Sequence, residues 1–207
     1  MSRNTRAIPA LQHRFVPGLR FDTEAQALRN GRWSDLSWPT DGDDSEHFRV
    51  CLRQCLEVLG LSSRQLPATD AVEWSDWQRD DLPRPFALAK PMEGAVSIAS
   101  LPYVSPAELW ACAHLGIEAG AAGILRLAGT SGVQRWVLLT GVEQVAQGKR
   151  IKPRSLLVLD PGLPRQWGCG HNARLHLQPA QAAHAYRGLD GDRSTVAVNR
   201  CLILRRE

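Results

Sequence analysis

The stretch RWVLLTGV, at residues 135–142, carries the clearest strand signal in the chain. It is a short apolar run that follows a turn, which is typical of a buried strand. A polar loop at 147–154 separates it from SLLVLDP at 155–161, a second run of the same kind. Further apolar or alternating segments lie at 122–127, 174–177 and 195–204. Successive strands joined by short turns indicate an antiparallel sheet in the second half of the chain.

Two helices are expected before this sheet. Within 45–60, apolar residues recur at helical spacing and form the stripe Phe48, Leu52, Cys55, Leu56 and Leu59. Ser105 can cap a second helix, because Pro106 takes its first position and Glu108 can reach back to the cap. These elements predict an α+β fold in which N-terminal helices pack on a C-terminal antiparallel sheet.

The segment 61–104 is harder to interpret, because proline residues interrupt any long element. Short strands are expected at 86–89 and 95–101. Trp74 and Trp77 are expected to be core residues or part of an interface, so the oligomeric state stays open.

The composition fits one globular domain with an extension. The chain has 207 residues, of which 43% are hydrophobic, and this excludes a disordered or fibrous protein. We assign residues 1–44 to an N-terminal arm and residues 45–207 to the domain. No apolar run reaches the ~18 residues that a membrane-spanning helix needs. The first residues lead into no secretory signal, so we expect a cytoplasmic protein without a membrane span.

The cysteines and the charges argue against two further classes of protein, those held by disulfides and those that bind nucleic acid. An odd number of cysteines without a signal peptide argues against a disulfide framework, so each is a core residue or a reactive thiol. The five are Cys51, Cys55, Cys112, Cys169 and Cys201. Lys and Arg number 25 against 21 Asp and Glu, and most of the basic residues are scattered along the sequence. This scatter argues against a nucleic-acid partner.

The order of a Cys-bearing helix and an antiparallel sheet resembles the papain-like cysteine peptidases. The closest likeness is to the bacterial double-glycine peptidases, which remove the leader peptides of bacteriocins. In that family the nucleophilic Cys heads a helix, and Cys51, Cys55 and Leu56 match its spacing. The strands at 135–141 and 157–161 match the strands that carry the family's His and Asp, so the resemblance covers residues 45–162. It implies a papain-like fold with a groove for an extended peptide.

Three departures from this pattern bear on catalysis. Arg135 stands where the family has its His, and a guanidinium cannot act as a general base near neutral pH. Cys51 is flanked by Val50 and Leu52, where the family has Asp and Gly. Ser45 stands where the family has the Gln that stabilises the oxyanion.

We therefore favour a catalytically degenerate papain-like domain that binds a peptide or protein partner. This hypothesis predicts an ion pair between Arg135 and Asp160 and an unreactive Cys51. The alternative is an active cysteine peptidase or thiol amide hydrolase with Cys51 as nucleophile, Asp160 as orienting group and a rearranged His. His171 is the first candidate for that His, and His47, one turn before Cys51, is the second. A further alternative is an accessory protein associated with nucleic acid.

A metal site is a weaker possibility around Cys169, His171 and His176. These residues supply three ligands at most, and the sequence contains no Cys-x-x-Cys pair. We expect neither a metal nor another cofactor. His114 lies within the second predicted helix and is expected to be half-buried there.

Overall fold

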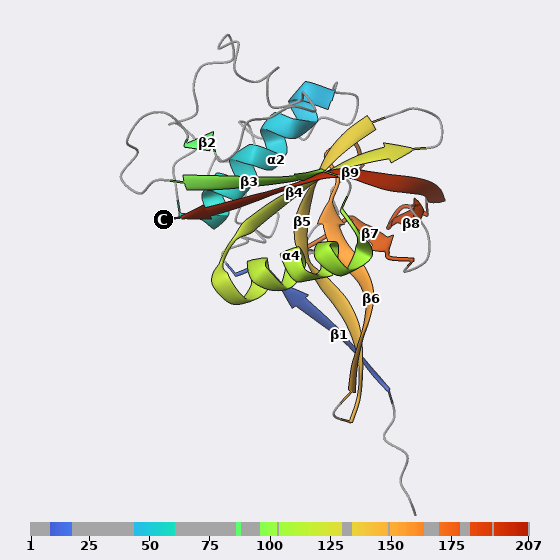
Figure 1. The fold of residues 1–207 in the computed structure, drawn as a ribbon. Helices are drawn as coiled ribbons and strands as arrows, with labels where there is room; N and C mark the ends of the chain where they lie inside the picture. Colours follow the sequence, from blue (N-terminus) through green and yellow to red (C-terminus); the bar gives the residue numbers. More distant parts are fainter. Residues whose placement is uncertain are drawn as a thin grey trace, which may run out of the picture.

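The structure is a computed structural model that describes residues 9–17, 44–60, 86–87, 96–102, 104–129, 134–148, 150–163, 170–178, 183–191 and 193–206. Figure 1 shows the order of the elements along the chain. They are β1 (Ala10–Phe15), α2 (Asp44–Val58), β2 (Phe86–Ala87), β3 (Val96–Pro102), α4 (Pro106–Ala119), β4 (Ala122–Gly129), β5 (Gln134–Gln147), β6 (Arg150–Leu159), β7 (Ala173–His176), β8 (Ala183–Gly188) and β9 (Arg193–Arg206).

Strands β4 to β9 form a closed antiparallel barrel of six strands. Each strand pairs with the next along the chain, and β9 returns to pair with β4, with Ala122 opposite Leu204. Strands account for 58% of the described residues, and these contain only two short helices. The expected α+β papain-like fold is therefore wrong. The local sequence pattern predicted most of the strands. The barrel closes through the pairing of β4 with β9, and such a long-range pairing leaves no pattern in the local sequence.

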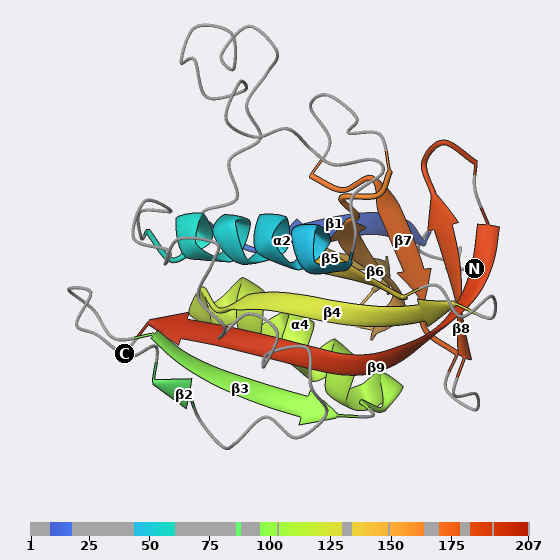
Figure 2. The ribbon, with the colours of Figure 1, turned by 90° about the horizontal axis from the view of Figure 1, so that it is seen from above.

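Parts of β4, β5, β6 and β9 are buried on both faces, which explains their uninterrupted apolar runs. β7 and β8 alternate, with only one face fully buried. Inside the barrel, Val137 and Leu139 join a core to which α4 contributes Leu109 and Ile117. Outside it, Trp136 and its neighbours on β4 and β9 pack under α2. Figure 2 shows α2 and α4 on opposite sides of the layer formed by β4 and β9.

Both predicted helices are present. α2 begins at Asp44, and its apolar stripe lies against the sheet. α4 begins with the predicted capping box: the Glu108 amide donates to the Ser105 hydroxyl, and the Glu108 carboxylate accepts from the Ser105 amide. It ends at Gly120, whose φ of 65° suits glycine. Packing of the apolar side chains places the helices against the sheet, and the capping box determines the residue at which α4 begins.

Two extensions widen the sheet beyond the barrel. β3 pairs with β9 and carries β2, near the two predicted strand positions. β1, from the expected N-terminal arm, pairs with the distal half of β5, and β5, β6 and β1 project together from the barrel (Figure 1). Trp74 and Trp77 lie outside the described residues, and so do residues 1–8 and 18–43 of the arm.

Candidate functional site

Cys51 lies in the apolar core beneath α2. Its exposed fraction is 0%, and its cluster contains Phe48, Leu52 and Trp136. The rings of Phe48 and Trp136 pack with their centroids 4.7 Å apart. A nucleophilic thiol needs access to substrate and an environment that stabilises the thiolate. The burial of Cys51 leaves its thiol no such access. Burial also raises the pKa of the neighbouring Cys55 thiol far above its usual range.

The predicted ion pair between Arg135 and Asp160 is present. Arg135 is the second residue of β5 and Asp160 follows β6, and the two strands are neighbours in the barrel. An Nη of Arg135 donates to Oδ2 of Asp160 over 2.9 Å. The Asp160 side chain is fully buried, whereas that of Arg135 is 33% exposed. The buried carboxylate of Asp160 therefore holds the guanidinium of Arg135, as the sequence predicted.

Asp160 accepts two further hydrogen bonds. The Tyr186 hydroxyl donates to Oδ2 over 2.5 Å, and the Gly162 amide donates to Oδ1 over 2.8 Å. Burial, and then the charge of Asp160, raise the pKa of Tyr186 well above its usual value. Tyr186 belongs to the core inside the barrel. A buried carboxylate with three donors stabilises the end of the barrel and has little capacity left to orient a base.

His47, one turn before Cys51 on α2, lies beside this carboxylate. A Cβ placed on Gly162 would lie 3.2 Å from Oδ1 of Asp160, 3.3 Å from Cε1 of His47 and 3.6 Å from an Nη of Arg135. The His47 side chain is buried, and neither ring nitrogen has a hydrogen-bond partner among the described residues. Sequence reasoning placed His47 one turn from Cys51 but could not show that it meets Arg135 and Asp160.

His171, the first candidate for a rearranged base, belongs to a different cluster. Its ring packs against His13, with the centroids 5.6 Å apart, and against Phe15 at 6.1 Å. Burial, together with the positive charges of Arg174 and His13, lowers its pKa to about 4. A base of that pKa takes up protons poorly near neutral pH. The structure thus brings Asp160 together with Arg135 and His47, and it places the ring of His171 in a separate cluster with His13 and Phe15.

A second buried carboxylate, Glu143 of β5, lies in the cluster of His171. Its side chain is only 4% exposed, and it pairs with His13 at 3.0 Å, Arg174 at 3.1 Å and Arg154 at 3.2 Å. The Ser155 hydroxyl donates to it over 3.0 Å. Burial favours a raised pKa for Glu143, but these hydrogen bonds and charges lower it below its usual value. Sequence reasoning missed this cluster, and the one available signal was an acidic residue within an apolar strand.

β1 forms an open edge of the sheet, since among the described residues it pairs only with β5. The amide of Val16 donates to Thr140 over 2.8 Å. Backbone groups alternate along an antiparallel strand, so the amides of Leu11 and His13 point away from β5. Leu11 is 52% exposed. An edge of this kind can accept another strand.

Within the described residues, no group of three or more potential ligands could hold a metal ion. Cys169 lies outside those residues, so the candidate metal site of Cys169, His171 and His176 is only partly described. None of the described helices has the length and apolar character to cross a membrane. Comparisons with protein-family models, with curated proteins and with solved structures each find no match for this chain.

Proposed function

We propose that this chain is a non-catalytic domain that binds a peptide or protein partner, which adds a strand to the open edge of β1. The observation that carries the non-catalytic part is the pairing of Arg135 with Asp160. Arg135 cannot take a proton from a thiol at neutral pH, and its neighbour Asp160 already accepts from three donors. The full burial of Cys51 supports the same conclusion.

The edge of β1 supports the binding part. Strand addition uses main-chain hydrogen bonds for affinity and side chains on alternate positions for specificity. The outward amides of Leu11 and His13 supply the donors, and the exposed Leu11 side chain supplies apolar contact. The peptide groove implied by a papain-like fold is not carried over, because the fold is a closed barrel.

Panning of a phage library of linear peptides against the full chain tests the binding part. Leu11→Pro removes the outward amide and spares the hydrogen bonds to β5, because proline is tolerated on an edge strand when its nitrogen faces solvent. Leu11→Ala is the matched control, since it shortens the side chain and keeps the amide. We expect the selected peptides to bind the wild type and the Leu11→Ala variant, and not to bind the Leu11→Pro variant. Enrichment of no peptide, or equal binding to the Pro variant, would contradict strand addition.

Thiol labelling tests the non-catalytic part separately. With iodoacetamide at about pH 6, where only an activated thiol reacts quickly, we expect Cys51 to stay unlabelled in the native chain. It should react once the chain is denatured and the pH is raised to about 8.5, near the pKa of a free thiol. Rapid, stoichiometric labelling of Cys51 in the native chain would instead favour the active peptidase.

A further inference from the structure

Three arginines lie side by side on the outer face of the barrel. Arg174 of β7 is directly opposite Arg187 of β8, and Arg187 is directly opposite Arg193 of β9. Their neighbours Leu175 and Tyr186 belong to the core inside the barrel. Since side chains alternate between the two faces of a strand, the three arginines point outward. We call them the arginine row.

Among the described residues, only one arginine of the arginine row has an acidic partner. Arg174 pairs with Glu143, but Glu143 also serves Arg154 and His13. Arg187 and Arg193 are exposed, and no acidic side chain of the described residues pairs with either. Like charges placed directly opposite each other destabilise a sheet. An anionic partner would remove this repulsion and gain bidentate hydrogen bonds from the guanidinium groups.

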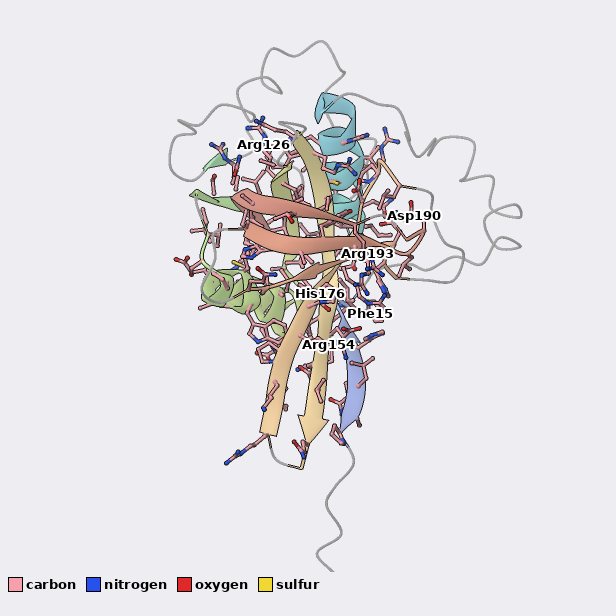
Figure 3. The ribbon with its side chains drawn as sticks, turned by 90° about the vertical axis from the view of Figure 1, so that its right-hand side faces the viewer. Phe15, Arg126, Arg154, His176, Asp190 and Arg193 are labelled. Carbon is pink, nitrogen blue, oxygen red and sulfur yellow. The ribbon has the colours of Figure 1, made fainter. Side chains whose placement is uncertain are left out.

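Beside the arginine row lies an imidazole ring with two small side chains next to it. In the next cross-strand row, His176 lies opposite Ala185, and Ala185 lies opposite Thr195. Burial lowers the pKa of His176; Glu143 opposes this shift, and Arg187, Arg154 and Arg174 add to it. Figure 3 looks onto this face, where the labels of Arg193, His176, Phe15 and Arg154 follow one another down the barrel.

We propose that this face, formed by the arginine row with His176, Arg154 and the half-exposed ring of Phe15, binds single-stranded nucleic acid. This inference goes beyond the proposed function and uses side chains on a sheet face rather than the edge of β1. Proteins that bind single strands without sequence preference combine a positive surface for phosphates with rings on which bases stack. On this face the arginines supply the positive surface, and His176 and Phe15 supply the rings.

An acidic peptide is the competing partner, and the pairing of the strands argues against it. β7 and β8 each have a hydrogen-bonded strand on both sides. An extended peptide on this face would therefore find no open backbone groups for strand addition. A phosphate backbone needs none, since guanidinium groups bind it directly.

Fluorescence anisotropy with a labelled oligo(dT) and the full chain tests the proposal over a range of salt concentrations. We expect binding whose logarithmic association constant falls linearly with the logarithm of the salt concentration. The double variant Arg187→Gln, Arg193→Gln should weaken binding at least about tenfold and reduce the salt slope by about 1.4, since each phosphate contact on a single strand contributes about 0.7.

The matched control is Arg205→Gln, Arg206→Gln, which removes the same charge from the other end of β9, where both residues are exposed. It should bind almost as the wild type does. An equal loss in both double variants would show that net charge alone matters and would overturn the proposal. So would the absence of binding at low salt, in a chain whose circular dichroism shows that it is folded.

A second comparison separates nucleic acid from an acidic peptide. Phe15→Leu keeps an apolar side chain and removes the stacking ring, so it should weaken oligo(dT) and leave binding of an oligoglutamate peptide unchanged. If oligoglutamate binds as tightly as oligo(dT), and Phe15→Leu affects neither, the partner is an acidic peptide and the proposal is wrong.

Discussion

At the residue scale, the hydroxyl of Tyr186 donates to a fully buried carboxylate that is already paired with Arg135. Tyr186→Phe removes that donor and leaves Asp160 less well satisfied. Hydrogen bonds to charged groups contribute about 1.5–3 kcal/mol. We therefore predict that this variant loses about that much free energy of unfolding, as measured by urea denaturation. A loss below about 0.5 kcal/mol, which is typical of surface substitutions, would contradict a stabilising role for the Asp160 carboxylate.

Arg187 also makes a prediction about stability. It lies directly between Arg174 and Arg193 on the barrel. Like charges opposite each other on a sheet cost about 0.2–1 kcal/mol relative to neutral pairs. Arg187→Gln should therefore raise the melting temperature at low ionic strength, and added salt should reduce the difference from the wild type. A melting temperature below that of the wild type would show that Arg187 has a stabilising partner.

His171 makes the stability of the chain depend on pH. Its pKa in the folded protein is lowered to about 4, whereas the unfolded residue titrates near 6.5. Between these values the unfolded state binds more protons, so the free energy of unfolding falls as the pH decreases from about 7 to 4. One proton gives a slope of at most about 1.4 kcal/mol per pH unit. The lowered pKa values of His176 and His184 act in the same direction.

The variant His171→Leu isolates this contribution. Denaturant titrations across the same range of pH should give it a shallower loss of stability than the wild type. Parallel curves for the two proteins would mean that folding does not shift the pKa of His171, which would contradict the effect of its burial and of Arg174 and His13.

At the element scale, Gly141 controls how β1 joins the sheet. A Cβ at this position would lie 2.2 Å from the carbonyl oxygen of Arg14 and 3.0 Å from Cα of Phe15. Gly141→Ala should therefore separate β1 from β5 while the barrel itself stays intact. Hydrogen exchange should show faster exchange at the Val16 amide, which donates to Thr140, and unchanged exchange in β4 and β9. Equal protection of Val16 in both proteins would contradict this close approach.

The elements show how far the sequence could predict the structure. The capping residues of α4 and the apolar runs of β4, β5 and β6 are local signals, and the sequence predicted these elements. The predicted polar loop at 147–154 was too long, because β6 already begins at Arg150. β8 was missed because its residues, AHAYRG, show no strong apolar alternation. β1 was missed because five of its six residues are exposed, so burial leaves no pattern in them. The ion pair of Arg135 and Asp160 was predictable from a family resemblance, whereas the cluster of Glu143 joins β1, β5, β6 and β7 and required the fold.

At the scale of the whole molecule, closure of the barrel brings together positions far apart in the sequence. Ala128 of β4 lies opposite Ala197 of β9. Neighbouring Cα atoms in an antiparallel pair lie about 4.5–5.5 Å apart, within the range that a disulfide spans. The double variant Ala128→Cys, Ala197→Cys should therefore cross-link on mild oxidation, as detected by mass spectrometry of peptides. The pair Ala128→Cys, Ala185→Cys is the control and should not, since these positions are not partners in the register.

The pairing of β4 with β9 also has a consequence for biosynthesis. β4 leaves the ribosome well before β9, and until β9 follows, one side of β4 has no strand to satisfy its amides and carbonyls. Exposed strand edges of this kind promote association between nascent or newly released chains. A truncation before β9 should therefore yield aggregated material rather than a smaller folded domain. By pairing with β4, β9 covers this edge and so protects the chain against self-association.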